Sequence, residues 1–223
     1  MGTEALRTSE GLGVLHLFCH FGVEVNKTRI IEIVDKANAS EMQVVTVSIL
    51  GHKADLGFMV LSNDWIQLRK FQTDMAEAGL NVTDSYVSLT EISEYAAGVP
   101  EEMRQARLYP ELPPEGKPAW CFYPMSKRRN PQQNWFTLDF EKRKELMYEH
   151  GASGRKFTGR VLQVITGSSG VDDYEWGVTL FCVHPDDLKE VVYTMRFDEA
   201  SAEYAEFGSF YSGFVANVNN LLS

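Results

Sequence analysis

Apolar positions in the first half of the chain switch repeatedly between an alternating pattern and a helical one. Residues 12–23 predict a strand with Val14, His16 and Phe18 on one face. Helical spacing follows an N-cap at Asn26, and β-branched runs predict further strands. The predicted strands cover residues 12–23, 43–50, 56–61 and 82–92, and the predicted helices cover residues 26–37 and 63–79. This order, β-α-β-β-α-β, is that of the ferredoxin-like unit.

The second half of the chain repeats this order. Strands are predicted at residues 120–123, 156–167, 175–183 and 209–215, and helices at residues 139–149 and 185–196. The predicted divisions are a loose N-terminal segment (1–10), an N-terminal half (11–97), a Pro- and Gly-rich connector (98–118) and a C-terminal half (119–223). We therefore predict an α+β fold in which two ferredoxin-like halves pair their sheets into a barrel-like sandwich with helices outside.

Composition narrows the class of protein. The 223 residues carry a formal net charge of −10, which argues against non-specific binding of nucleic acid. Any acidic ligand therefore needs a local cluster of cations. Cys19, Cys121 and Cys182 form no CxxC pair and are odd in number, which is typical of reduced thiols in a cytosol. Because the chain shows neither a signal-peptide pattern nor an apolar run near about 18–20 residues, we expect no membrane span and a cytoplasmic protein.

The stretch that carries the most chemistry is FYPMSKRRNPQQNWFTLDFEKRKELMYEHGASGR. An apolar strand is predicted to deliver Tyr123 to a turn at Pro124, and the basic residues 127–129 follow at once. A helix is then predicted to end at His150 and Gly151. A redox-active phenol, cations and an imidazole thus lie on one short unit, and we expect the rest of the chain to build a pocket around them.

Each of these residues also has an ordinary interpretation. His150 shares a helical face with Phe140 and Met147, and a histidine at a helix end is favoured by the helix dipole. Tyr123 fits packing at a strand end, and Gln163 lies in an apolar strand, where a buried amide needs partners. The sequence contains no P-loop, no GxGxxG after a strand and no GxSxG elbow. Taken one at a time, these residues support only an α+β protein of unassigned function.

Several separated blocks, in a fixed order, resemble a known family. They are RLYPELPP, FYPMSKRR, NW, LMYEHGASGR, ITGSSG, DDYEWGVTLF and MRFDEASAEYAEFG. Together they resemble the coproheme decarboxylases, which belong to the chlorite dismutase-like family of heme proteins. The resemblance covers nearly all of the chain from about Arg107 onward and is weaker through GHKADLGFMVLSNDW.

The resemblance implies a fold, an activity and partners. The fold is a dimeric α+β barrel of two ferredoxin-like halves, assembled as a homopentamer. The activity is the hydrogen peroxide-dependent removal of two carboxyl groups from iron coproporphyrin III (coproheme), which yields the vinyl groups of heme b in the last step of heme biosynthesis. Coproheme is then both substrate and cofactor, and coproporphyrin ferrochelatase is an expected transient partner.

The resemblance also implies roles for particular residues. The proximal iron ligand corresponds to His150, the radical-forming tyrosine to Tyr123, and a neighbouring catalytic lysine to Lys127. Gln163 corresponds to the distal pocket, but an amide does not titrate near neutrality, so the base that deprotonates peroxide stays open. The other positions expected to contact the porphyrin or its propionates are Arg107, Tyr109, Met125, Trp135, Arg196 and Ser201.

Two other functions are compatible with the family. A chlorite dismutase is expected to have an arginine over the iron, whereas this chain has Gln163 at that position. A heme carrier or sensor binds porphyrin without converting it, and an oxidisable residue such as Tyr123 at the propionate edge argues against that function. Coproheme decarboxylation is the function that we expect.

Overall fold

Both predicted β-α-β-β-α-β orders are present in the computed structural model, which describes residues 4–96 and 98–222. The N-terminal half consists of β1 (Gly13–Phe21), α1 (Lys27–Asn38), β2 (Gln43–Ile49), β3 (Leu56–Ser62), α2 (Trp65–Glu77) and β4 (Leu80–Thr90). The C-terminal half contains β5 (Ala119–Lys127), α4 (Phe140–Arg155), β8 (Val161–Gly167), β9 (Trp176–Cys182), α5 (Pro185–Met195) and β11 (Tyr211–Val215). Shorter elements are α3 (Glu101–Leu108), β6 (Arg129–Asn130), β7 (Gln133–Asn134), the 3-10 helix η1 (Trp135–Thr137), α6 (Glu199–Ala202), β10 (Ala205–Phe207) and α7 (Val218–Leu222).

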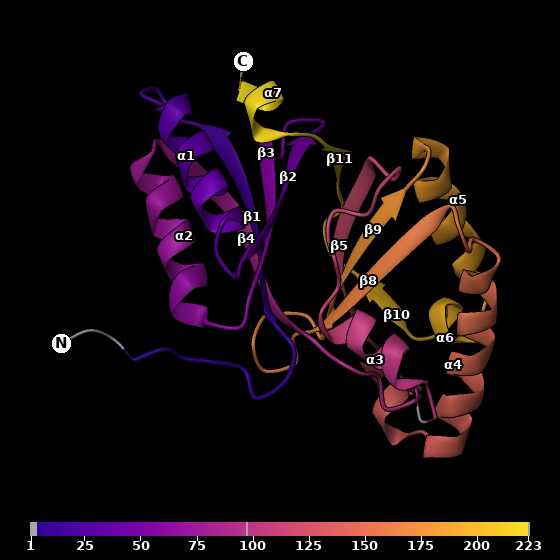
Figure 1. The fold of residues 1–223 in the computed structure, drawn as a ribbon. Helices are drawn as coiled ribbons and strands as arrows, with labels where there is room; N and C mark the ends of the chain where they lie inside the picture. Colours follow the sequence, from indigo (N-terminus) through magenta and orange to yellow (C-terminus); the bar gives the residue numbers. More distant parts are fainter. Residues whose placement is uncertain (1–3, 97, 223) are drawn as a thin grey trace.

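The strands of both halves form one closed sheet. In the described part of the chain the strand order is β10-β5-β11-β2-β3-β1-β4-β8-β9, and β9 pairs again with β5 to close the ring. The halves meet where β11 pairs with β2 and where β4 pairs with β8. Helices α1 and α2 cover one side of this barrel, and α4 and α5 cover the opposite side (Figure 1). The predicted α+β barrel of two ferredoxin-like halves is therefore confirmed.

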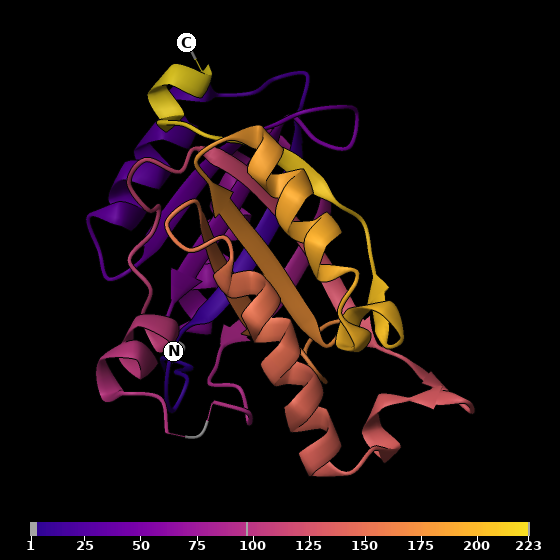
Figure 2. The ribbon, with the colours of Figure 1, turned by 90° about the vertical axis from the view of Figure 1, so that its right-hand side faces the viewer.

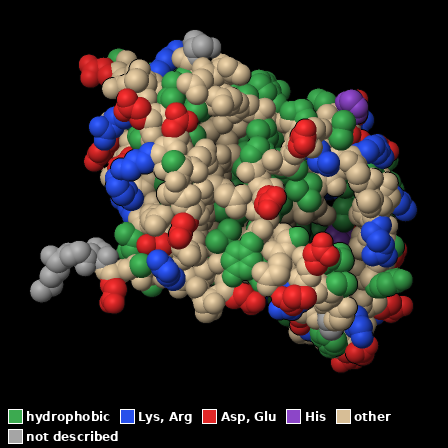
Figure 3. Space-filling model, viewed as in Figure 1, with side chains coloured by type: hydrophobic (Ala, Val, Ile, Leu, Met, Phe, Trp, Pro, Cys, Tyr) green, Lys and Arg blue, Asp and Glu red, His purple; other side chains and the backbone are tan. Residues whose placement is uncertain are grey.

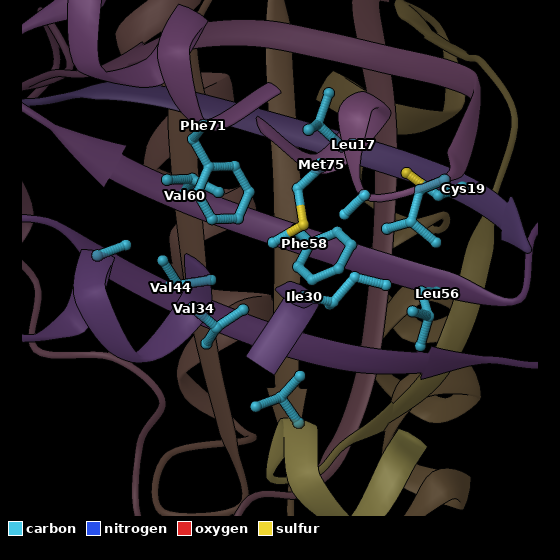
Figure 4. Close-up of a cluster of buried hydrophobic side chains, with 14 of the residues drawn as sticks. Leu17, Cys19, Ile30, Val34, Val44, Leu56, Phe58, Val60, Phe71 and Met75 are labelled. Atoms are coloured by element: carbon cyan, nitrogen blue, oxygen red, sulfur yellow. The ribbon is translucent and has the colours of Figure 1, made fainter. Parts of the chain in front are cut away.

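Apolar layers cover the outside of the barrel at both halves, and a further apolar layer fills the inside of the ring. Helices α1 and α2 pack on the outer face of the N-terminal strands, where Ile30 and Phe71 meet Phe58 (Figure 4). On the other side, α4 and α5 lie across β8 and β9 (Figure 2), and Val191 of α5 packs in one cluster with Leu180 of β9. Fully burying such a side chain stabilises the fold by about 1.5–3 kcal/mol, so the alternation in the sequence directs each strand face to its own layer.

The interior of the ring also contains buried polar groups. His16 is fully buried, its Nε2 lies 3.1 Å from Thr179 Oγ1, and its ring stacks on Phe122 with centroids 4.1 Å apart. Within the described residues, His16 Nδ1, Ser88 Oγ and Trp120 Nε1 have no hydrogen-bond partner. Burial lowers the pKa of His16 from 6.5 to about 3, because the apolar interior penalises the charged imidazole.

Acid is therefore expected to destabilise the fold through His16. Below pH 6.5 the unfolded chain takes up a proton at this residue, whereas the folded chain does so only near pH 3. The free energy of unfolding should thus decrease as the pH is lowered, and His16 should account for about 3 kcal/mol of this decrease between pH 7 and pH 4. Urea unfolding of His16→Phe should show a correspondingly weaker pH dependence. The exposed His52 is the matched control, and equal slopes for wild type, His16→Phe and His52→Ala would contradict the assignment.

Strand β5 does not turn at Pro124, so that prediction was wrong. The strand continues to Lys127, and Pro124 pairs with Gly177 of β9. On its other side, Pro124 faces the gap between β10 and β11, so the missing N–H removes no ladder hydrogen bond. Its carbonyl oxygen still accepts a hydrogen bond from the N–H of Gly208 at 2.8 Å. Lys127 consequently lies at a buried strand end and not in a solvated turn.

Helix α4 does not end at His150 and Gly151, which corrects a second prediction. It continues to Arg155, and neither Gly151 nor Gly154 has a positive φ angle. A glycine inside a helix costs roughly 1 kcal/mol relative to alanine, but α4 packs against α5 and α6, with Gly154 beside Met195 of α5 and His150 bonded to Asp198 before α6. His150 therefore has more than one helical turn beyond it, and β8 begins only at Val161 because turns occupy residues 156–160.

The connector and the described part of the N-terminal segment both contain ordered structure. The connector contains helix α3, with Glu101 and Glu102 in its first turn and Arg107 in its last, as the helix dipole favours. In the N-terminal segment, Leu6 and Thr8 form backbone hydrogen bonds to the corner between β3 and α2. The predictions for residues 1–3, 97 and 223 lie outside the described residues. None of the described helices is long and apolar enough to cross a bilayer, and the three cysteines are free in this structure.

Candidate active site

A cavity of about 1120 Å³ lies between the C-terminal strands and the helices that cover them. Strands β5, β8 and β9 form one wall, α4 and α5 another, and α3 with residues 91–95 a third. In the space-filling view the molecule is hollowed over the C-terminal half, with hydrophobic side chains in the hollow and charged side chains on the outer helices (Figure 3). A mainly apolar cavity of this size, with a few polar groups, is typical of a site for a large organic ligand.

His150 lines this cavity from helix α4 and is held by Asp198. The imidazole Nδ1 lies 3.2 and 3.1 Å from the two carboxylate oxygens of Asp198, and 3.3 Å from Ser201 Oγ. A carboxylate on Nδ1 fixes the ring and leaves Nε2 as the nitrogen available to a metal, which is the usual outer-sphere arrangement of a histidine ligand. The donor set therefore fits an iron ligand supplied by α4.

Asp198 is itself fixed in its charged form. It caps α6, where its carboxylate accepts the N–H of Ser201 at 2.9 Å, and its side chain is buried. Burial alone would raise the pKa of Asp198, but the hydrogen bonds from His150 and Ser201 and the attraction of the imidazole outweigh it, so the pKa lies below its ordinary value. The sequence prediction missed Asp198, because 48 residues separate it from His150.

Tyr123 presents its phenol to the same cavity from strand β5. The ring is buried and stacks on Phe210 with centroids 4.4 Å apart, while Phe207 packs edge-on at 5.6 Å. In the described part of the structure, the hydroxyl forms no hydrogen bond to protein. Burial raises the pKa of Tyr123, so the phenol stays protonated at neutral pH.

Lys127 lies two alternations further along β5, on the same cavity wall. Its Nζ donates to the carbonyl oxygen of Ala200 at 2.6 Å and sits 4.5 Å from the centre of the Trp135 ring. Only 6% of the residue is exposed, and this burial lowers the pKa of Lys127 to about 8, although Asp198 and Glu175 act in the opposite direction. A lysine near that pKa can bind an anion and can also donate a proton near neutrality.

Most of the remaining predicted site residues lie together at this cavity, and Tyr109 does not. Met125, Trp135, Gln163, Arg107, Arg196 and Ser201 all line the cavity. The Arg196 guanidinium lies 4.6 Å from the Phe207 ring centre. No ion pair to a described residue engages either Arg107 or Arg196, so both cations are free to meet carboxylates. Tyr109 is outside the cavity lining, and its hydroxyl instead accepts the N–H of Gly11 at 3.1 Å.

Gln163 and Glu175 approach the cavity from the sheet. Gln163 lies on β8, on the wall across from helix α4, and is only half-buried. Glu175, which precedes β9, is a buried carboxylate that the sequence analysis did not single out. In the sequence it is an acidic residue at the start of a predicted strand, which is ordinary.

Comparison of the sequence with known proteins points to one family. The family model described as Chlorite dismutase matches residues 24–216. The chain is 47% identical over 180 residues to coproheme decarboxylase from Staphylococcus carnosus, covering 75% of this chain and 71% of that protein. It is 45% identical over 186 residues to coproheme decarboxylase from Staphylococcus saprophyticus, covering 78% of this chain and 73% of that protein.

Comparison of the structures agrees. A heme-binding protein from Thermus thermophilus has a TM-score of 0.87 and 33% sequence identity, covering 98% of this chain and 96% of that one. A chlorite dismutase variant from Candidatus Nitrospira defluvii has a TM-score of 0.78 at 18% identity, covering 96% and 95%, and shares the fold. Because the family model matches most of this chain, and because relatives that are 33–47% identical are found by both comparisons, the chain belongs to the chlorite dismutase family.

Proposed function

We propose that this chain is a coproheme decarboxylase, which converts iron coproporphyrin III to heme b with hydrogen peroxide as the oxidant. One observation carries the proposal: a histidine held by a carboxylate, a buried tyrosine and a buried lysine line a single large cavity. The two relatives named coproheme decarboxylase support it, since each shares more than two fifths of the aligned residues. The half-buried Gln163 on the sheet wall also supports it, because a chlorite dismutase is expected to have an arginine at this position.

The residues present fit an iron porphyrin. His150, oriented by Asp198, supplies an imidazole nitrogen on one wall, and the apolar walls suit a macrocycle. Arg107 and Arg196 provide cations for the propionates, as a ligand with four carboxylates requires in a protein of net charge −10. When bound, the iron porphyrin would supply the chemistry by which peroxide is reduced and oxidising equivalents are delivered.

The chain's own residues then have separate tasks. Tyr123 gives up its phenolic hydrogen on oxidation, and the resulting phenoxyl takes a hydrogen atom from the propionate chain. Loss of carbon dioxide and of one further electron leaves a vinyl group. Each round consumes one propionate, one peroxide and one proton, and releases one vinyl, one carbon dioxide and two water molecules. Lys127 binds the reacting carboxylate or supplies that proton.

Adding hydrogen peroxide stepwise to the purified protein with coproheme tests this function. Mass spectrometry of the extracted porphyrin should show loss of two carboxyl groups, with about two equivalents of peroxide consumed per heme b. A carrier or sensor would return unchanged coproheme. A chlorite dismutase would also leave the carboxyl groups of coproheme in place, and would convert chlorite when chlorite is added in a parallel sample. Either result would overturn the proposal.

The role of the free cations gives a prediction about selectivity. Arg107→Ala and Arg196→Ala should weaken binding of coproheme, with four carboxylates, more than binding of heme b, with two. A hydrogen bond between charged groups contributes about 1.5–3 kcal/mol, which corresponds to about ten- to a hundredfold in affinity. Arg104→Ala is the control, because Arg104 lies on the same helix but pairs with Glu10 and Glu101. Equal losses for both porphyrins, measured by titration, would contradict the assignment.

The resemblance also predicts a homopentamer in the cytoplasm and transient contact with the coproporphyrin ferrochelatase. These assignments belong to the same proposal. Sedimentation analysis of the purified protein would test the pentamer directly, and a monomer with full activity would remove that part of it.

A further inference from the structure

We propose that Glu175 is a positioning residue that keeps Lys127 charged and fixed at the cavity wall. The inference deepens the proposed function, because it concerns a residue assigned there to the substrate carboxylates. Glu175 would not touch the substrate in this role. It would act through Lys127, whose backbone N–H its carboxylate accepts.

Hydrogen bonds in both directions lock Glu175 to the end of β5. Its carboxylate Oε2 accepts the backbone N–H of Lys127 at 2.8 Å. Its own N–H donates to the carbonyl oxygen of Met125 at 3.1 Å and lies 3.2 Å from Ser126 Oγ. Only 7% of the residue is exposed. A carboxylate held in this way cannot turn toward solvent when Lys127 changes its protonation state.

Lys127 needs such a partner, because burial opposes its charge. The charged groups around it are Asp198 before α6, Glu175 before β9, Glu206 on β10, and Arg128 and Arg129 next in the chain. Burial has the largest effect on the pKa of Lys127 and lowers it, while Asp198 and Glu175 are the groups that raise it. The Nζ donates to a backbone carbonyl and faces a ring, so no carboxylate of the described residues is bonded to it directly.

Asp198 and Glu175 have different hydrogen-bond partners. Asp198 is bonded to His150 and to the N–H of Ser201, so changing it would disturb the iron ligand as well. Glu175 is instead bonded to the end of β5 and forms no hydrogen bond to His150 within the described chain. Its second oxygen faces Arg129 at 3.6 Å, and that side chain is 69% exposed, so solvent screens the pair. Glu175 is therefore the acid through which the charge of Lys127 can be changed while the histidine stays as it is.

The substitution Glu175→Gln tests the proposal, because it keeps the shape and the acceptor for the Lys127 N–H but removes the charge. The pKa of Lys127 is measured in the ligand-free protein by NMR of ¹³C-labelled lysine, with Lys127→Arg to assign the signal. It should fall by about one unit from its wild-type value, as expected on losing a nearby opposite charge. In Glu175→Asp, which keeps the charge, the pKa of Lys127 should stay close to its wild-type value.

A kinetic measurement follows the same group. The alkaline limb of the pH profile of kcat/KM reports the free enzyme, and it should move to lower pH by the same amount in Glu175→Gln. Glu206→Gln is the control, because Glu206 is an exposed carboxylate on the neighbouring strand β10. It should move neither quantity.

The possible outcomes separate this inference from the proposed function. An unchanged pKa of Lys127, or a shift no larger than that in Glu206→Gln, overturns the inference whether or not the protein makes heme b. A shifted pKa with an unmoved alkaline limb also overturns it, because Lys127 would then not carry the effect. Glu175→Met provides a second neutral side chain of similar length if the amide prevents folding.

Discussion

Tyr123→Phe is expected to stop decarboxylation while leaving the folded protein and its porphyrin binding almost unchanged. The ring packing against Phe207 and Phe210 survives the substitution, and within the described residues the lost hydroxyl had no hydrogen-bond partner. Surface or cavity substitutions without lost partners usually change stability by less than about 1 kcal/mol. Heme b formation should fall by more than about a hundredfold, because phenylalanine has no phenolic O–H hydrogen to give up on oxidation. The measurement is the rate of carboxyl loss, followed by mass spectrometry under excess peroxide.

A second phenol on the cavity wall supplies the control. Tyr95 also lines the cavity, and its hydroxyl accepts from Arg143 at 3.0 Å. Tyr95→Phe should retain most of the activity. Heme b production by Tyr123→Phe at close to the parent rate would remove the radical assignment. Trp135, packed beneath Lys127 at 4.5 Å, would then be the first oxidisable residue to test, with Tyr109 the next.

His150→Ala is expected to change the ferric porphyrin spectrum and to weaken coproheme binding severely. The substitution removes the only imidazole that lines the cavity in the described structure. Asp198→Asn should have a smaller effect, about 10- to 100-fold in affinity, since the ligand would remain but lose its oriented partner. Added imidazole should restore part of the spectrum of His150→Ala. His184→Ala, which changes a residue outside the cavity, should behave as wild type, and an unchanged spectrum in His150→Ala would exclude His150 as ligand.

The sequence predicts the fold well because each strand and helix carries its own pattern. The alternation of Val14, His16 and Phe18 places those side chains inside the ring, and Leu15 and Leu17 in the outer layer. The misplaced ends arise where long-range packing outweighs local preference. Glycines within LMYEHGASGR read locally as a helix stop, yet α4 continues because it packs on α5 and α6. Pro124 reads as a turn, yet a gap in the neighbouring strands accommodates it.

The site was only partly predictable for the same reason. Tyr123 and Lys127 could be singled out from the sequence because both lie in the block FYPMSKRR, but the strand was predicted to end at Tyr123, so only the structure places both residues on one face of β5. Asp198 and Glu175 act on residues 48 positions away, and nothing local marks them as partners. Burial of Lys127 likewise depends on Ala200 and Trp135, which only the folded chain brings beside it.

The closed strand order also constrains how this chain can reach its native state. Strand β11 fits between β5 and β2, and Val218 and Leu222 of α7 complete the first apolar core. The N-terminal half therefore lacks a strand neighbour for β2 and part of its apolar core until the end of the chain is present, although its pattern is complete by residue 90. Until residues 211–222 join it, the edge of β2 stays open to other chains, which favours aggregation. Non-local pairing of this kind slows folding, so the edge of β2 is expected to stay exposed for longer during synthesis of this chain than its size alone suggests.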